Sequence, residues 1–254
     1  FEPAVPRAAW RYGVPVVSLD HQHFLVTTDF SGLPRYLQGH AAFMAACVEM
    51  YYTTQVETIV SSFFSPPLKP QYHDVTQVGV LLRAEFFDMA PRDGAYLLVY
   101  WRKLSNPLAL EALQATGREV RIYGQGAQPD DGNLRFFPVD PQRFLDDLAG
   151  CDALVTTAGN QLLGESFYFR KPVFAIPEPN NYEQYINAYF LEQSGMGTWA
   201  EPHLVSPTHL HAFLERLEDY RAQIDPERAV GNARALAAIA RHLPAPARGP
   251  RVAV

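Results

Sequence analysis

The spacing of apolar and polar positions divides the first part of the chain into alternating helical and strand segments. It predicts a helix over residues 3–12, a strand over 14–19, a helix over 33–55 and a strand over 59–64. The two strand segments are apolar and rich in β-branched residues, whereas the 33–55 segment spaces its apolar residues helically. A strand, a helix and a second strand in this order are typical of an α/β unit.

The segment from residue 95 onward alternates more regularly. Strands are expected at 95–101, 119–123, 134–137, 153–156 and 172–176, and helices at 107–116, 141–149, 160–169, 182–193, 208–222 and 227–242. Asn106 and Asp140 precede two of these helices and are predicted to cap them. This alternation predicts a doubly wound parallel sheet, which binds ligands beyond the carboxyl ends of its strands.

Residues 66–94 interrupt the pattern with four prolines and a turn, and they retain a short apolar segment at 78–82. We therefore expect a domain junction in this part of the chain. The predicted division is an incomplete N-terminal domain over 1–82, a linker over 83–94, a C-terminal domain over 95–240 and a tail over 241–254.

Composition narrows the class of protein. The 254 residues carry a formal net charge of -6, which argues against a general polyanion binder. Cys47 and Cys151 lie far apart without metal-ligand spacing, as expected in a reducing cytoplasm. No apolar run approaches the roughly 20 residues of a membrane-spanning helix. The chain begins with Phe1, and its first residues lack the layout of a signal peptide.

The loop between the strand 153–156 and the helix 160–169 is the strongest chemical signal. It reads Thr156-Thr157-Ala158-Gly159-Asn160-Gln161, and its small residues would let a phosphate approach the backbone. The free N–H groups and the dipole of the following helix favour an anion. Alternatively, Gly159 only turns the chain. This alternative stays open because short glycine motifs often occur without binding a phosphate.

Polar side chains follow on the next two helices. Glu165 lies one to two turns into its helix, where a carboxylate can accept two hydrogen bonds from a sugar diol. The alternative is that Glu165 is an ordinary solvated glutamate. The loop after the strand 172–176 leads into a helix that presents Glu183, Gln184 and Asn187. Carboxylate and amide groups suit sugar hydroxyls, although N-terminal capping explains any one of these residues.

Residues 148–197 together resemble the C-terminal donor domain of family 28-like glycosyltransferases. The matching features run in order: the AGN loop, a glutamate on the next helix, a KP-strand-P element, an EQ-x-x-NA run and a Gly-x-Gly. This family includes the transferase that adds N-acetylglucosamine to the lipid-linked peptidoglycan precursor. The resemblance implies a GT-B fold, in which a doubly wound donor domain faces a second Rossmann-like domain.

The family pattern assigns a role to each matching position. It implies that Ala158, Gly159, Asn160 and Gln161 hold the diphosphate, Glu165 the ribose and Val139 the uracil. Glu183 and Gln184 would contact the donor sugar, with Asn187 supporting their loop. The loop 101–105 would face the phosphates through Trp101 and Arg102 or Lys103, although it lacks the glycines of many relatives. No metal and no cofactor are expected, since the UDP-sugar is a substrate.

The N-terminal segment also resembles this family. Asp20, His21 and His23 follow the strand 14–19, like the acceptor-facing loop of a poorly characterised microbial branch. They would bind acceptor hydroxyls or move a proton, unless they only hydrogen-bond to backbone. Relatives begin with further strand–helix units and a histidine base. We therefore expect roughly a hundred residues of the acceptor domain, and the main general base, to be missing from this chain.

The sequence thus predicts a cytoplasmic, inverting, metal-independent transferase of a hexose or N-acetylhexosamine from a UDP-sugar. The acceptor stays open, as does peripheral membrane contact, and no nucleic acid is expected. This chain would bind the donor without a complete catalytic site. The alternatives are a UDP-sugar 2-epimerase-like enzyme and a non-catalytic nucleotide-sugar-binding protein. A dinucleotide oxidoreductase is disfavoured because no Gly-x-Gly-x-x-Gly turn follows the strand 95–101.

Overall fold

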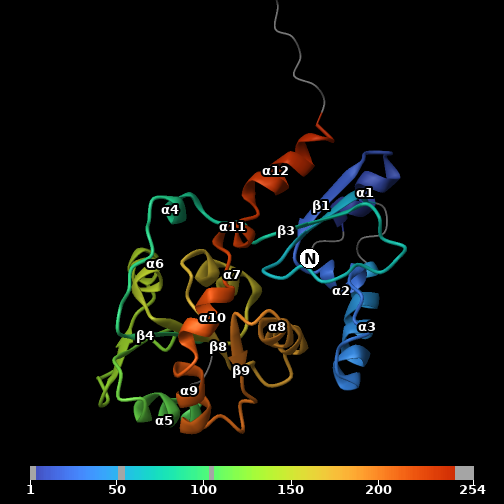
Figure 1. Ribbon diagram of the computed structural model, residues 1–254. Coiled ribbons are helices and arrows are strands. Elements are labelled where there is room, and N and C mark those ends of the chain that lie inside the picture. The colour runs from blue at the N-terminus through green and yellow to red at the C-terminus, as the bar shows by residue number, and fades with distance from the viewer. Residues whose placement is uncertain (1–3, 51–54, 103–105, 244–254) are drawn as a thin grey trace, which may run out of the picture.

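Two parallel β-sheets organise the chain, which the computed structural model describes for residues 4–50, 55–102 and 106–243. Within these residues the smaller sheet has the order β1-β2-β3 and the larger one the order β6-β5-β4-β7-β8-β9. Figure 1 shows α8, which belongs to the larger sheet's half, facing α2 and α3 of the other half. The predicted α/β fold with parallel sheets is confirmed.

The strands of the smaller sheet are β1 (Val16–Asp20), β2 (Gln55–Ser61) and β3 (Val75–Val78). Those of the larger sheet are β4 (Leu97–Tyr100), β5 (Val120–Tyr123), β6 (Leu134–Phe137), β7 (Ala153–Thr156), β8 (Val173–Ala175) and β9 (Gly197–Trp199). The helices of the described residues are α1 (Ala4–Arg11), α2 (Phe24–Thr27), α3 (Arg35–Glu49), α4 (Ala84–Phe87), α5 (Pro107–Ala115), α6 (Pro141–Gly150), α7 (Asn160–Tyr168), α8 (Tyr182–Gln193), α9 (Pro207–Leu214), α10 (Leu217–Gln223), α11 (Pro226–Ala229) and α12 (Asn232–Ala240).

The central strand β4 shows why the larger sheet is parallel and buried. Leu97 and Val99 pack into one cluster of core residues, and Leu98 packs into another on the opposite face; all three are 0% exposed. Alternate residues of a strand point to opposite faces, so helices must cover both sides. Asn106 caps α5 and Asp140 caps α6 through side-chain oxygens, as predicted.

Several predicted boundaries are wrong. The helix expected over 33–55 ends at Glu49, and β2 already begins at Gln55, where Thr58, Ile59 and Val60 are β-branched and pair with both neighbouring strands. In the stretch 66–94, the sequence pattern missed β3 and α4. It also missed α2 and β9, which are only three or four residues long and carry no periodic signal.

The two helices expected at 208–222 and 227–242 are each broken. The first divides between α9 and α10 at Arg216, which lets Phe213 and Tyr220 stack with ring centroids 5.5 Å apart. The second divides because Val230 forms a β-bridge with Val80 and the Gly231 N–H donates to the Val80 carbonyl at 2.8 Å. A continuous helix over these residues could not pair with Val80 in this way.

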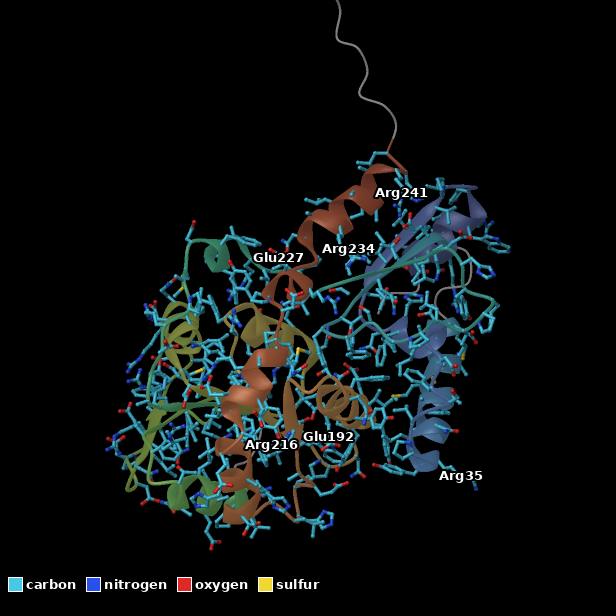
Figure 2. All side chains as sticks on the ribbon, in the orientation of Figure 1. Arg35, Glu192, Arg216, Glu227, Arg234 and Arg241 are labelled. Atoms are coloured by element: carbon cyan, nitrogen blue, oxygen red, sulfur yellow. The ribbon has the colours of Figure 1, made fainter. Side chains whose placement is uncertain are left out.

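The last helix, α12, packs against the smaller sheet and not against the larger one. Its Ala235 and Ala238 contact a cluster with Ile59 of β2 and Val78 of β3. Figure 2 shows Arg241 at the far end of α12, beside the smaller sheet, where it pairs with Glu57. The predicted tail spans 241–254. Its first residues, Arg241 and His242, pair with Glu57, residues 244–254 lie outside the described residues, and the proposed domain limits stay a prediction.

Among the described helices, none has the length and apolar character needed to cross a bilayer.

Candidate donor-binding cleft

Strands of both sheets end at one cleft of about 580 Å³. Asp20 ends β1 and Ser61 ends β2, whereas Tyr100 and Thr156 end β4 and β7 on the opposite side. The order of the larger sheet reverses between β4 and β7. Doubly wound sheets bind ligands at this reversal, so topology and shape both indicate the same site.

Most of the residues predicted for the site line this cleft. They are Asp20, His21, Arg102, Gly159, Asn160, Gln161, Glu183 and Gln184. Others lie outside its lining, namely His23, Trp101, Val139, Ala158, Glu165 and Asn187. Lys103 lies outside the described residues.

The loop before α7 is held in an unusual backbone conformation. Ala158 has a φ of 64°, in the left-handed region that costs a non-glycine residue about 1 kcal/mol or more. The Asn187 amide donates to the Ala158 carbonyl at 3.0 Å and fixes this conformation. Gly159 then begins α7 as an N-cap without a side chain. The first N–H groups of α7 therefore present the positive end of the helix at the cleft wall.

The Asn160 side chain joins the two halves of the molecule. Its oxygen accepts from the Phe63 N–H at 3.1 Å and from the Ser62 hydroxyl at 3.2 Å, and its amide donates to the Ser61 carbonyl at 3.2 Å. The side chain is therefore occupied, and only the backbone N–H of Asn160 is left for an anion.

The first turn of α8 presents a carboxylate and an amide. Asn181 caps the helix by accepting from the Gln184 N–H, so capping does not account for Glu183. The Gln184 oxygen accepts from the Glu178 N–H at 2.7 Å, and its amide donates to the Thr157 hydroxyl at 3.4 Å. Gln184 thus connects the loop before α8 with the loop before α7, and the Glu183 carboxylate faces the cleft.

The loop after β1 supplies the opposite wall. The Nδ1 of His21 donates to the Ser61 carbonyl at 3.0 Å, because a carbonyl only accepts. Its Nε2 lies 3.8 Å from Glu183. Burial lowers the pKa of His21, while Glu183 and the Ser61 carbonyl act to raise it. The neutral ring therefore directs an Nε2 lone pair toward Glu183.

His23 is separated from the cleft. Its Nδ1 lies 2.7 Å from the Asp20 carboxylate, and its Nε2 lies 3.0 Å from the Gln55 amide at the start of β2. The ring is 2% exposed and borders a second hollow beside β2 and β3. The Asp20–His23 pair thus holds the turn that carries His21.

Two residues expected at the nucleoside, Glu165 and Val139, lie outside the lining of the cleft. Glu165 is half-buried, which raises the pKa of its carboxyl group, and it accepts from the Gln161 amide at 3.0 Å. Val139 is 59% exposed, after β6. Trp101 was expected to face the phosphates, but its side chain is 5% exposed and packs in the core, so that expectation is wrong for Trp101.

Sequence reasoning missed several residues that line the cleft. They are Gln22, Ser61, Tyr100, Glu178 and Asn181. Ser61 and Tyr100 are the last residues of their strands, so correct strand ends would have revealed them. Gln22 lies inside the Asp20–His23 run, and no local signal shows that it meets a residue of α8.

The fold defines the class of protein. The calicheamicin glycosyltransferase CalG4 superimposes with a TM-score of 0.61 at 20% identity, covering 93% of this chain and 70% of CalG4. MurG of Acinetobacter baumannii gives a TM-score of 0.58 at 16% identity, covering 92% of this chain and 68% of MurG. At these identities the likeness shows the fold alone, which is the GT-B type expected from the sequence.

The chain belongs to the family described as glycosyl transferase family 1, whose profile matches residues 1–218. It is also 26% identical over 171 residues to an uncharacterised glycosyltransferase of Methanopyrus kandleri, covering 58% of this chain and 48% of that protein. The chain therefore spans about half the length of this curated relative. The sequence resemblance to GT-B glycosyltransferases is confirmed.

Proposed function

We propose that this chain binds a UDP-sugar in the cleft and serves a transferase that moves a hexose or N-acetylhexosamine to an acceptor hydroxyl. The reaction inverts the configuration at the anomeric carbon of the sugar and uses no metal. One observation carries the proposal: the N-terminus of α7 and the carboxylate of Glu183 line the same cleft. An anion site thus lies beside a group that accepts sugar hydroxyls.

The N-terminus of α7 would bind the diphosphate. Its first N–H groups and its dipole stabilise the negative charge that develops when the bond to the sugar breaks. Arg102 lines the cleft after β4 and is exposed, so it adds a mobile positive charge to this leaving group.

The nucleoside would extend out of the cleft toward Glu165 and Val139. Glu165 would accept the ribose hydroxyls, with the Gln161 amide, 3.0 Å from one carboxylate oxygen, holding it in place. The uracil would lie against Val139, whose exposed side chain offers an apolar surface. Burial keeps the pKa of Glu165 above its ordinary value, and hydroxyl groups that donate to the carboxylate oppose that effect.

Among the residues of this chain, His21 would help to move the proton of the acceptor hydroxyl, whereas the family resemblance places the main general base in the part expected to be missing. The acceptor oxygen forms a bond to the anomeric carbon, the bond to the diphosphate breaks, and its electron pair leaves with the diphosphate. The proton goes to the Nε2 of His21, which is free to take it because Nδ1 already donates to Ser61. The negative charge of Asp20 would stabilise the resulting imidazolium, since it acts to raise the pKa of His21.

An epimerase is the second candidate, because the carboxylates of Asp20, Glu178 and Glu183 gather with His21 around the cleft. A 2-epimerase would convert a UDP-sugar without any acceptor. Turnover that requires an added acceptor excludes this function, and turnover of the UDP-sugar alone supports it.

Thermal unfolding and calorimetry with UDP, UDP-N-acetylglucosamine, UDP-glucose and NAD test the proposal. At a concentration of 100 times Kd, a UDP compound should raise Tm by about 5–10 °C. Glu165→Ala should reduce this response. Glu111→Ala, a matched change on the exposed face of α5, should leave it as in the wild type. A folded wild-type protein that binds NAD but no UDP compound would rule out the proposed donor.

A further inference from the structure

One hydrogen bond links the predicted sugar-binding carboxylate to the opposite half of the molecule. The Gln22 amide donates to Oε2 of Glu183 at 2.8 Å, across 161 positions of sequence. Both residues line the cleft. The Gln22 backbone is itself held, because the Asp20 carboxylate accepts from the His23 N–H at 2.9 Å and tightens the turn between them.

The second oxygen of Glu183 is left facing His21. Oε1 lies 3.8 Å from the Nε2 of His21. The imidazole is fixed from two sides, by the bond from Nδ1 to Ser61 and by stacking on Phe24 with ring centroids 4.4 Å apart. A carboxylate oxygen and a nitrogen lone pair are both acceptors, so they favour a ligand with hydroxyl groups between or beside them.

Asn187 adds a third acceptor in the same place. It lies one turn after Glu183 on α8, is 0% exposed, and its side chain is within hydrogen-bonding reach of the His21 ring. Its amide nitrogen is used by the Ala158 carbonyl. While the His21 ring is neutral, its Nε2 and the Asn187 oxygen are both acceptors, and neither has a hydrogen-bond partner among the described residues. A protonated Nε2 would donate to this oxygen, which acts to raise the pKa of His21. Buried acceptors of this kind are unfavourable until a donor group reaches them.

We propose that Gln22 is a positioning residue for donor recognition: it holds one oxygen of Glu183 so that the other accepts a hydroxyl of the transferred sugar beside His21. This inference rests on the proposed function. Gln22 does not touch the reacting atoms. It sets the orientation of the carboxylate from the opposite half of the molecule, so the donor sugar is recognised by both halves together.

Two substitutions separate this role from a purely structural one. Gln22→Met keeps the size of the side chain and removes the donor. It should weaken UDP-N-acetylglucosamine or UDP-glucose binding about tenfold while leaving UDP binding unchanged. Gln22→Glu places two carboxyl groups together. Its UDP-sugar binding should be weak at pH 8 and recover at pH 5, where one of the pair is protonated and donates to the other.

Gln71→Glu is the matched control, since Gln71 is exposed in the same half and the change adds the same charge. Calorimetry on this variant should show wild-type binding at both pH values. The inference is overturned if both Gln22 variants bind the UDP-sugars like the wild type, or if they lose UDP and UDP-sugars to the same extent. If the folded wild type binds no UDP, the proposed function fails first, and this inference fails with it.

Discussion

The side-chain oxygen of Asn160 accepts a hydrogen bond from the backbone N–H of Phe63 at 3.1 Å. This bond joins the first residue of α7, which lines the cleft, to the segment that follows β2. The asparagine that resembles a diphosphate ligand therefore has a second task, which is to fasten the smaller sheet to the donor-binding helix.

Replacing Asn160 should destabilise the protein more than it weakens nucleotide binding. Asn160→Ala leaves the buried Phe63 N–H without its acceptor, whereas the Ser61 carbonyl keeps the hydrogen bond from His21, so the free energy of unfolding should fall by about 1–3 kcal/mol. Urea unfolding measures this loss, with Gln142→Ala on the exposed surface of α6 as the control. Folded Asn160→Ala should still bind UDP, because the backbone N–H groups of α7 remain. Unchanged stability would contradict the bridging role.

No side chain should fit at Gly231, because this residue passes against the backbone of Gly79. A Cβ there would lie 2.0 Å from the Gly79 carbonyl oxygen, so Gly231→Ala should destabilise by about 2 kcal/mol or more. Gly39→Ala is the matched comparison, because a Cβ on this residue of α3 meets nothing within 4 Å. Alanine favours a helix, so this change should stabilise by roughly 0.5–1 kcal/mol. Denaturant titration of both variants checks the contrast.

The fastening of α12 to the smaller sheet should weaken in acid. Burial raises the pKa of Glu57, but hydrogen bonds from Thr76, His242 and Arg241 outweigh it and bring the pKa below its ordinary value of 4.5. A carboxyl group whose pKa is lower in the folded state stabilises above its unfolded pKa, and this stability is lost as pH falls through the folded value. Unfolding free energies measured from pH 7 down to pH 3 should therefore fall less steeply for Glu57→Gln than for the wild type.

The ionisation of His21 should depend on Glu183. Burial lowers the pKa of His21 from 6.5, and the negative charge of Glu183 opposes this effect most strongly. Glu183→Gln removes that charge and should lower the pKa further. An NMR titration of the His21 ring in both proteins measures the change. A higher pKa in the variant would show that Glu183 does not act on His21 as the structure indicates.

The pKa of His21 also sets a direction for stability. Because its folded value lies below 6.5, the unfolded chain binds the proton more readily. Stability should therefore rise with pH between the folded pKa and 6.5. His21→Gln should show a smaller rise over this window in urea unfolding, and an equal rise in both proteins would place its origin elsewhere.

Local sequence patterns predicted the larger sheet well. The strand cores from β4 to β8 and the caps Asn106 and Asp140 were found because alternation, turn residues and capping are properties of short segments. The same patterns failed where tertiary contacts override local preference. The sequence predicts one helix over residues 227–242, yet the pairing of Val230 with Val80 breaks it.

By itself, the sequence determined the parallel α/β class, because strands and helices repeat with periods of two and 3.6 along the chain. Once the strand ends are placed, the sequence also gives the polar residues that follow them. Only the tertiary structure decided what these residues do to one another. In that structure the side chain of Asn160 bonds to Phe63, and His23 pairs with Asp20 outside the cleft. Gln22 bonds to Glu183. The packing of the two sheets sets such contacts, and no local pattern records a pairing across 161 residues.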